Sequence, residues 1–342
     1  MAPTNGSILA TESWDIADFV INTGHGVKGL AEMGLKSLQK QFHQPLQERL
    51  SEKKILGQVS IPFINKLKWE SPEVAKSICD AAESWGFFQI VNHGEKRKYS
   101  KENSPTNNVR FGSSFVRHVE RALDWKDSLS LFYVSEEETA AFWPPVCKDE
   151  MLEYRKSSEV LIKRLMHVLV KGLNVKRIDE IRALMLLGSR RATSTTILFN
   201  LNYYPMCPNP EHTVGVGRHS DISTFTILLQ DDIGGLHVRK DNGNGWIHVS
   251  LISRSFIINI WDPLQIISKG RHKSIEYCVI ANGSQNMILV LLFVNPKPEG
   301  ILCPFPEVLA NGKKPLHFYT KAHVGNKTID FAKISNVCDE NM

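Results

Sequence analysis

The strongest constraint on the fold is a series of short, β-rich runs in the second half of the chain. Each run is rich in Val, Ile, Leu, Phe or Tyr, and the runs alternate with Gly, Pro, Asn and Asp. They cover residues 196–203, 223–229, 235–239, 246–249, 255–260, 275–280 and 287–294. Short strands separated by turn residues are typical of antiparallel sandwiches and barrels. We therefore predict an all-β second half.

The first half of the chain predicts helices instead. Ser71 and Pro72 mark a helix start, as N-cap and first helical residue. The longest predicted helix covers residues 149–172 and ends at a glycine, and a second is predicted over 178–187. Two strands are also predicted, at 59–64 and 86–91. A helical first half followed by an all-β second half predicts an α+β protein.

Charge and composition exclude several classes of protein. The formal net charge is +5 over 342 residues, and the basic residues form no stripe, so no nucleic-acid partner is expected. The six cysteines show no CxxC spacing, which indicates reduced thiols in a cytoplasmic protein. Residues 1–15 lack a secretory signal, and the apolar run at 287–294 is too short to span a bilayer. We expect a soluble protein with no membrane partner.

The most informative polar motif is His219-Ser220-Asp221, which follows a glycine-rich stretch. We expect it at the start of a β-run, where residues i and i+2 point to the same side and can bind one metal ion. With a distant histidine they would form a 2-His-1-carboxylate triad, which leaves positions on Fe(II) open for a cosubstrate and O2. The motif alone is weak, and a surface pair is the alternative.

The residues around this motif carry a family resemblance. They are Asn202-Tyr203-Tyr204-Pro205, Leu228-Leu229-Gln230-Asp231-Asp232, Gly234-Gly235-Leu236 and Lys273-Ser274-Ile275-Glu276, with Gly86-Phe87-Phe88-Gln89 and Asn92-His93-Gly94 in the first half. Together they resemble the plant 2-oxoglutarate- and Fe(II)-dependent dioxygenases over most of the chain. Other stretches look most similar to the feruloyl-CoA ortho-hydroxylases: Gly26-Val27-Lys28-Gly29-Leu30, Arg97-Lys98-Tyr99-Ser100, Trp125-Lys126-Asp127 and Trp143-Pro144-Pro145.

This resemblance implies a fold, a reaction and a set of cofactors. The fold is a double-stranded β-helix (jelly roll) with flanking helices and an N-terminal helical and β region. The implied reaction uses Fe(II), 2-oxoglutarate, ascorbate and O2 to hydroxylate a small aromatic substrate, such as feruloyl-CoA, ortho to its side chain, in coumarin biosynthesis. His219 and Asp221 would be iron ligands, and Asn202 and Tyr204 would border 2-oxoglutarate. A monomer is expected.

The chain departs from the family pattern at its site. Tyr277 stands where the family has its second histidine ligand, and Met287 and Leu289 stand where it has the Arg and Ser that bind 2-oxoglutarate. His272 lies at an odd offset from Tyr277, so we interpret it as a surface histidine and not as a substitute ligand. Trp261 replaces a family glycine, so its ring must fit beside the barrel wall.

These departures leave alternatives open. One is a catalytically impaired or inactive remnant that binds metal weakly at His219 and Asp221. Another is an altered metalloenzyme that uses Tyr277 as a ligand. A helix of the family is also missing after Gly94, and residues 191–200 look inserted.

We divide the chain into five segments. They are an N-terminal arm at 1–55, a dioxygenase N-terminal region at 56–150, connecting helices at 151–192, the jelly-roll domain at 193–300 and a C-terminal tail at 301–342.

Overall fold

The computed structural model describes most of the chain. The described residues are 16, 18–50, 55–56, 60–65, 71–91, 109–113, 122–175, 197–221, 223–239, 245–295, 304–309, 321–324 and 327–330. The predicted helix at 178–187 and the gap expected after Gly94 lie outside them. Of the stretch that looks inserted, residues 191–196 also lie outside, whereas residues 197–200 are described and begin a strand.

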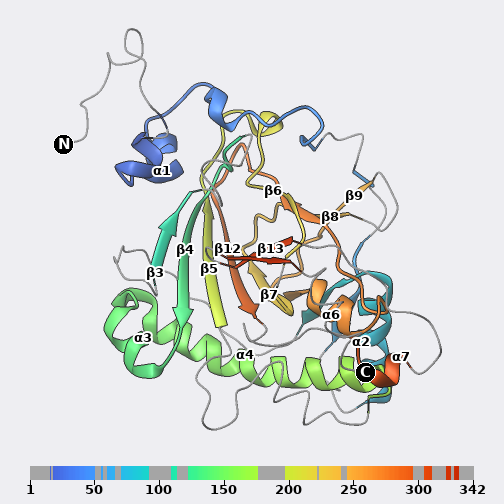
Figure 1. The fold of residues 1–342 in the computed structure, drawn as a ribbon. Coiled ribbons are helices and arrows are strands. Elements are labelled where there is room, and N and C mark those ends of the chain that lie inside the picture. The colour runs from blue at the N-terminus through green and yellow to red at the C-terminus, as the bar shows by residue number, and fades with distance from the viewer. Residues whose placement is uncertain are drawn as a thin grey trace.

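Two sheets form the centre of the molecule (Figure 1). The large sheet has the strand order β1 (Phe63–Asn65), β2 (Phe87–Val91), β10 (Phe256–Ile260), β7 (Phe225–Gln230), β12 (Met287–Val294), β5 (Ile197–Tyr204), β4 (Asp127–Tyr133) and β3 (Val109–Gly112). The small sheet has the order β6 (Val216–His219), β11 (Tyr277–Val279), β8 (Leu236–Arg239) and β9 (Trp246–His248). A hairpin of β13 (Lys321–Val324) and β14 (Lys327–Asp330) pairs with neither sheet.

The described helices lie around these sheets. They are α1 (Gly26–Glu32), α2 (Pro72–Ser84), α3 (Glu136–Phe142), α4 (Pro145–Gly172), α6 (Asp262–Ile267) and α7 (Pro306–Leu309). Short helical turns occupy Asp18–Asn22, Lys40–Phe42 and Pro210–His212. Figure 1 shows α4 running across the strands of the large sheet.

The large sheet is apolar on both faces because it separates two hydrophobic cores. Along β7, Ile227 belongs to the core shared with α2 and α4, whereas Leu228 belongs to the core between the two sheets. Ile258 and Ile257 divide in the same way on β10. Successive side chains of a strand point to opposite faces, so a strand buried on both sides is continuously apolar. The interior between the two sheets is where the candidate site lies.

The seven predicted β-runs are all strands in the structure, displaced by no more than two residues at their ends. The helix predicted at 149–172 begins earlier, at Pro145, and ends at Gly172 as expected. The strand predicted at 59–64 is wrong for residues 60–62, because pairing begins only at Phe63, and residue 59 lies outside the described residues. Strands β3, β4 and β6 and helix α6 were not predicted.

The described part of the N-terminal region packs against the rest of the protein. Val27 and Leu30 of α1 are fully buried with Phe42 and Trp125 in a third hydrophobic cluster. The Asp127 carboxylate accepts hydrogen bonds from the first backbone N–H groups of α1. This segment is therefore part of the folded body of the protein.

Candidate metal centre

Three side chains of the predicted site meet at one end of the small sheet. His219 is the last residue of β6, and the antiparallel register of β6 and β11 places it opposite Tyr277. Asp221 lies two residues beyond the end of β6, in the segment that leads toward β7. The prediction that the His219-Ser220-Asp221 motif starts a strand was therefore wrong. The motif ends one, and Asp221 reaches His219 from the following turn.

The hydroxyl group of Tyr277 links the other two side chains. It lies 2.9 Å from Nε2 of His219 and donates a hydrogen bond to Oδ2 of Asp221. Nε2 of His219 also lies 3.3 Å from Oδ1 of Asp221. The other ring nitrogen, Nδ1, is 2.8 Å from the carbonyl oxygen of Gly217 and must donate to it, because a carbonyl only accepts. The three side chains form a closed hydrogen-bonded cluster.

The charges in this cluster favour a protonated imidazole. Burial lowers the pKa of His219, but the charge and hydrogen bond of Asp221 outweigh burial and raise it above the ordinary value. Burial, together with the charge of Asp221, raises the pKa of Tyr277 well above its ordinary value, so the phenol keeps its proton. Because the phenol donates its own proton to Asp221, its oxygen is left to accept from Nε2 of a protonated His219. With His219 protonated, the arrangement satisfies the donors of the three side chains without a metal ion.

The residues expected to border 2-oxoglutarate lie on the neighbouring strands β5 and β12, and those on β12 are apolar. The register of β12 and β5 pairs Met287 with Tyr204 and Leu289 with Asn202, and all four side chains are buried. The side-chain N–H of Asn202 donates to the Tyr204 hydroxyl at 3.3 Å, and Oδ1 of Asn202 accepts from Ser128. Met287 and Leu289 offer no positive charge and no hydroxyl to a carboxylate.

The space beside Tyr277 is almost filled. A cavity of about 10 Å³ lies between the sheets, and Tyr277, Phe87 and Leu291 are among the residues that line it. A volume of this size holds at most one water molecule. In this conformation the side chains themselves occupy the interior next to the hydrogen-bonded cluster.

Lys126 and Asp124 form a buried ion pair near the cluster that the sequence analysis missed. Their side chains are 3% and 8% exposed, and Nζ of Lys126 lies 3.5 Å from Oδ2 of Asp124. Oδ1 of Asp124 accepts a hydrogen bond from the backbone N–H of Gly217, two residues before His219. The pair therefore helps to fix β6. The sequence held one signal for this pair: Lys126 stands in the motif Trp125-Lys126-Asp127, which we used only as evidence of family resemblance.

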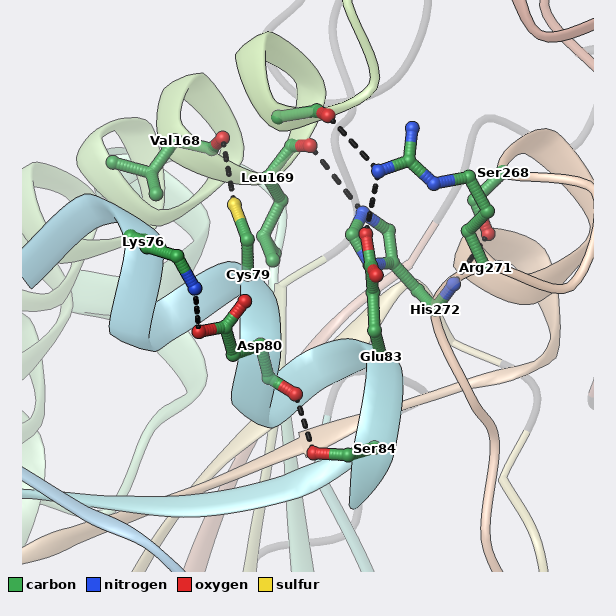
Figure 2. Close-up of polar contacts among 11 residues, drawn as sticks. Lys76, Cys79, Asp80, Glu83, Ser84, Val168, Leu169, Ser268, Arg271 and His272 are labelled. Carbon is green, nitrogen blue, oxygen red and sulfur yellow. Dashed lines mark hydrogen bonds and ion pairs between the residues drawn. The ribbon is translucent and has the colours of Figure 1, made fainter.

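His272 is not a surface histidine, so that interpretation was wrong. Its side chain is fully buried, and Nε2 lies 3.3 Å from the carbonyl oxygen of Leu169 on α4 (Figure 2). Its backbone N–H donates to Ser268. Arg271 beside it bonds Glu83 of α2 at 2.6 Å and the carbonyl oxygen of Gly172 at 3.2 Å. His272 thus belongs to the joint between α2 and α4, away from the candidate ligands.

The ring of Trp261 fits beside the barrel wall, as predicted from the sequence. It follows β10, is 2% exposed, and packs edge-on against Phe293 of β12 with ring centroids 5.3 Å apart.

Comparison with known proteins assigns the class. The sequence model of the 2OG-Fe(II) oxygenase superfamily matches residues 196–296. A curated relative from Ruta graveolens, the bi-functional coumaroyl CoA and feruloyl CoA ortho-hydroxylase Diox4, is 66% identical over 371 residues, covering 97% of this chain and 99% of its own. The feruloyl CoA ortho-hydroxylase F6H1-3 of Ipomoea batatas is 51% identical, over 96% of this chain and 99% of its own. The chain belongs to the 2OG-Fe(II) oxygenase superfamily, within its group of hydroxycinnamoyl-CoA ortho-hydroxylases.

Solved structures confirm the fold. The crystal structure of JOX2 in complex with 2OG, Fe and JA aligns with a TM-score of 0.72 and 31% identity, over 90% of this chain and 91% of that one. The dioxygenase for auxin oxidation 1 from Arabidopsis thaliana, in its binary complex with 2-oxoglutarate, aligns over 72% of this chain and 97% of that one. Its TM-score is 0.58 at 19% identity, which supports the fold alone. The predicted α+β class with a jelly-roll core is thereby confirmed.

The cofactors of this superfamily are Fe(II) and 2-oxoglutarate, and the donor set of this chain fits them incompletely. Among the described residues, no group of three His, Cys, Asp or Glu side chains is placed to hold a metal ion. His219 and Asp221 are two candidate donors, and the third position holds the protonated Tyr277 hydroxyl. Fe(II) favours imidazole and carboxylate ligands over a neutral phenol. Within the described part of the chain, this site therefore offers two metal donors, and Met287 and Leu289 add no positive charge for 2-oxoglutarate.

Proposed function

We propose that this protein binds hydroxycinnamoyl-CoA thioesters and that its reaction is ortho-hydroxylation of their aromatic ring. The observation that carries this proposal is the 66% identity with the ortho-hydroxylase Diox4 over 97% of this chain. Such identity across nearly the whole length supports a shared substrate class as well as a shared fold. Small-molecule substrates and O2 are the partners of this class.

We further propose His219 and Asp221 as the iron ligands and Asn202 and Tyr204 as neighbours of 2-oxoglutarate. The short distance between the partly buried side chains of His219 and Asp221 supports the first role. The burial of Asn202 and Tyr204 and the hydrogen bond between them support the second. Turnover should be much lower than in the relatives. Binding a carboxylate beside Met287 without a cation leaves a buried charge unpaired, which costs about 3–5 kcal/mol. That corresponds to a loss of affinity for the cosubstrate of about 100-fold to several thousandfold.

A second candidate function is supported by the hydrogen-bonded cluster itself. Because Tyr277 satisfies both His219 and Asp221, the protein is also a candidate for a non-catalytic member that binds metal weakly or not at all. A monomer in the cytoplasm is proposed for either candidate. None of the described helices is long and apolar enough to cross a membrane.

One assay separates the candidates. Purified protein is incubated with Fe(II), 2-oxoglutarate, ascorbate and either feruloyl-CoA or p-coumaroyl-CoA, and succinate and hydroxylated product are quantified. If the protein is an ortho-hydroxylase, we expect slow, substrate-dependent formation of hydroxylated product, with one succinate released for each product molecule. A complete absence of product, combined with measurable binding of feruloyl-CoA, would leave the non-catalytic candidate.

A further inference from the structure

The outer face of the small sheet carries a second polar region that the metal centre does not use. Side chains alternate along its strands, so Arg218 and Cys278 point away from the interior while their neighbours His219 and Tyr277 point into it. The N-terminal segment crosses this outer face and joins it at Leu56, whose N–H donates to the carbonyl oxygen of Trp246. Between segment and sheet a cavity of about 220 Å³ is left.

Three arginines from two different parts of the chain line this cavity. Arg218 and Arg239 come from β6 and β8, and Arg49 comes from the N-terminal segment. Arg49 is fixed in place, because its guanidinium bonds the carbonyl oxygen of Gln44 at 2.7 Å and Nδ1 of His212 at 3.1 Å. Trp246 and Cys278 are also among the lining residues.

The arginines of this cavity differ in how closely neighbouring carboxylates approach them. Arg239 bonds Glu276 at 2.5 Å, which is a close ion pair. Arg218 has only long contacts, 3.8 Å to Glu48 and 4.0 Å to Glu276, which lie beyond hydrogen-bond distance. Arg218, whose side chain is 39% exposed, therefore has no carboxylate within hydrogen-bond distance among the described residues.

We propose that this cavity, which we term the arginine cavity, binds a phosphate group of a small-molecule ligand. Guanidinium groups bind phosphate oxygens through paired, charge-assisted hydrogen bonds, and two or more converging arginines select phosphate over neutral groups. A bound phosphate would give Arg218 a partner within hydrogen-bond distance, which neither Glu48 nor Glu276 provides.

The identity of this ligand rests on the proposed function: it is the phosphate-bearing nucleotide end of the acyl-CoA substrate. Strand β6 pairs only with β11 among the described strands, so it forms an edge of the small sheet. Arg218 on its outer face and His219 on its inner face are consecutive residues. A flexible ligand that passes this edge could contact the arginine cavity at one end and the interior at the other.

Binding can be measured without turnover, so the result does not depend on whether the protein is catalytic. The full-length protein is titrated calorimetrically at low ionic strength with inorganic diphosphate, adenosine 3′,5′-bisphosphate, CoA and, as an anion without phosphate, succinate. Arg218→Gln should weaken binding of the phosphate compounds by about 10-fold or more, the effect of losing a hydrogen bond between charged groups. Glu48→Gln should tighten it, because it removes a competing carboxylate.

Arg164→Gln is the matched control, because Arg164 is an exposed arginine on α4. It should leave the affinity unchanged, and the affinity of the unmodified protein should fall as salt is added. If diphosphate binds but CoA does not, the result would support the cavity as a phosphate site and overturn the assignment to the acyl-CoA. The proposal is overturned if none of the phosphate compounds binds, if succinate binds equally well, or if Arg218→Gln behaves like Arg164→Gln.

Discussion

The Tyr277 hydroxyl lies 2.9 Å from Nε2 of His219, and the two residues are direct partners in the register of β6 and β11. A side chain at position 277 therefore lies within reach of any ion held by His219. A histidine there could supply an imidazole nitrogen, whereas tyrosine supplies a protonated oxygen that joins His219 to Asp221. With His219 and Asp221 as the proposed ligands, we infer that position 277 decides between a metal site and a hydrogen-bonded cluster.

Tyr277→His should convert the cluster into a metal site. The variant places a second imidazole beside His219 and Asp221, which completes the 2-His-1-carboxylate set. We expect Fe(II) or Co(II) to bind at least about 100-fold more tightly than to the unmodified protein, since changes to the neighbours of ligands alone shift metal affinity by roughly 10–100-fold. Anaerobic calorimetric titration measures the change, and a metal-dependent rise in melting temperature should accompany it.

Tyr277→Phe is the control for this substitution. It removes the hydroxyl and both of its hydrogen bonds but adds no ligand, and the ring can keep its edge-on contact with Phe87 at 5.9 Å. Its metal affinity should stay far below that of Tyr277→His. Equal affinities in the two variants would mean that the hydroxyl merely blocks the site and that no third ligand is needed.

A second prediction concerns 2-oxoglutarate. In the Tyr277→His background, the pair Met287→Arg and Leu289→Ser should restore binding of the cosubstrate, because it adds a guanidinium and a hydroxyl to β12 opposite Tyr204 and Asn202. Without ligand this arginine would be buried and unpaired, so the variant should be less stable until 2-oxoglutarate is added. Thermal melting with and without 2-oxoglutarate tests both effects.

Met287→Gln is the matched control here, since glutamine is polar but uncharged. It should respond weakly to 2-oxoglutarate. If Met287→Arg gains no stabilisation from the dicarboxylate, position 287 does not face the cosubstrate in this chain, and the assignment of Asn202 and Tyr204 fails with it.

The β-runs of the second half could be predicted because their signal is local. In β7 and β10 every residue is buried, and the apolar runs are bounded by turn residues. Strand β6 escaped prediction because Val216-Gly217-Arg218-His219 has no such run, and its pairing depends on β11, about 60 positions away. The local pattern therefore indicates the sheet but not its edge.

The site could be predicted only in part for a similar reason. The sequence motif identifies His219 and Asp221, but the link through Tyr277 depends on the register of strands 58 positions apart. His272 was misinterpreted because its odd offset from Tyr277 argues only against a ligand role, whereas its buried contact is with Leu169, 103 positions away. The offset along a strand does not report what packs against a residue in space.

Gly26→Ala should destabilise the N-terminal region. Gly26 has φ +68°, and a Cβ there would lie 2.6 Å from Oδ1 of Asp127, the carboxylate that holds the first N–H groups of α1. The backbone strain alone costs on the order of 1–3 kcal/mol, and the close contact adds to it. Gly24→Ala is the matched control, because Gly24 has φ +73° with nothing within 4 Å of its Cβ. Urea unfolding should show the larger loss for Gly26→Ala; equal losses would mean that Asp127 moves aside freely.

Burial of His272 should make the protein less stable in mild acid. Burial lowers the pKa of His272 from its ordinary 6.5 to about 4, with Leu169 and Glu83 opposing the shift and Arg271 adding to it. Between these values the unfolded chain binds a proton that the folded protein excludes, so stability is full above pH 6.5 and declines as the pH falls toward 4. For this one group the decline from neutral pH to pH 5 amounts to about 2 kcal/mol.

His272→Leu removes the titrating ring and should flatten that decline. The free energy of unfolding is measured in urea at pH 7 and pH 5 for both proteins, and the comparison uses the difference between the two pH values, because the substitution also changes packing. His237, whose pKa burial likewise lowers to about 4, gives a parallel variant, His237→Leu, in which a loss of similar size should disappear. A decline in His272→Leu as steep as in the unmodified protein would show that His272 takes up its proton without unfolding, which requires the joint between α2 and α4 to open locally.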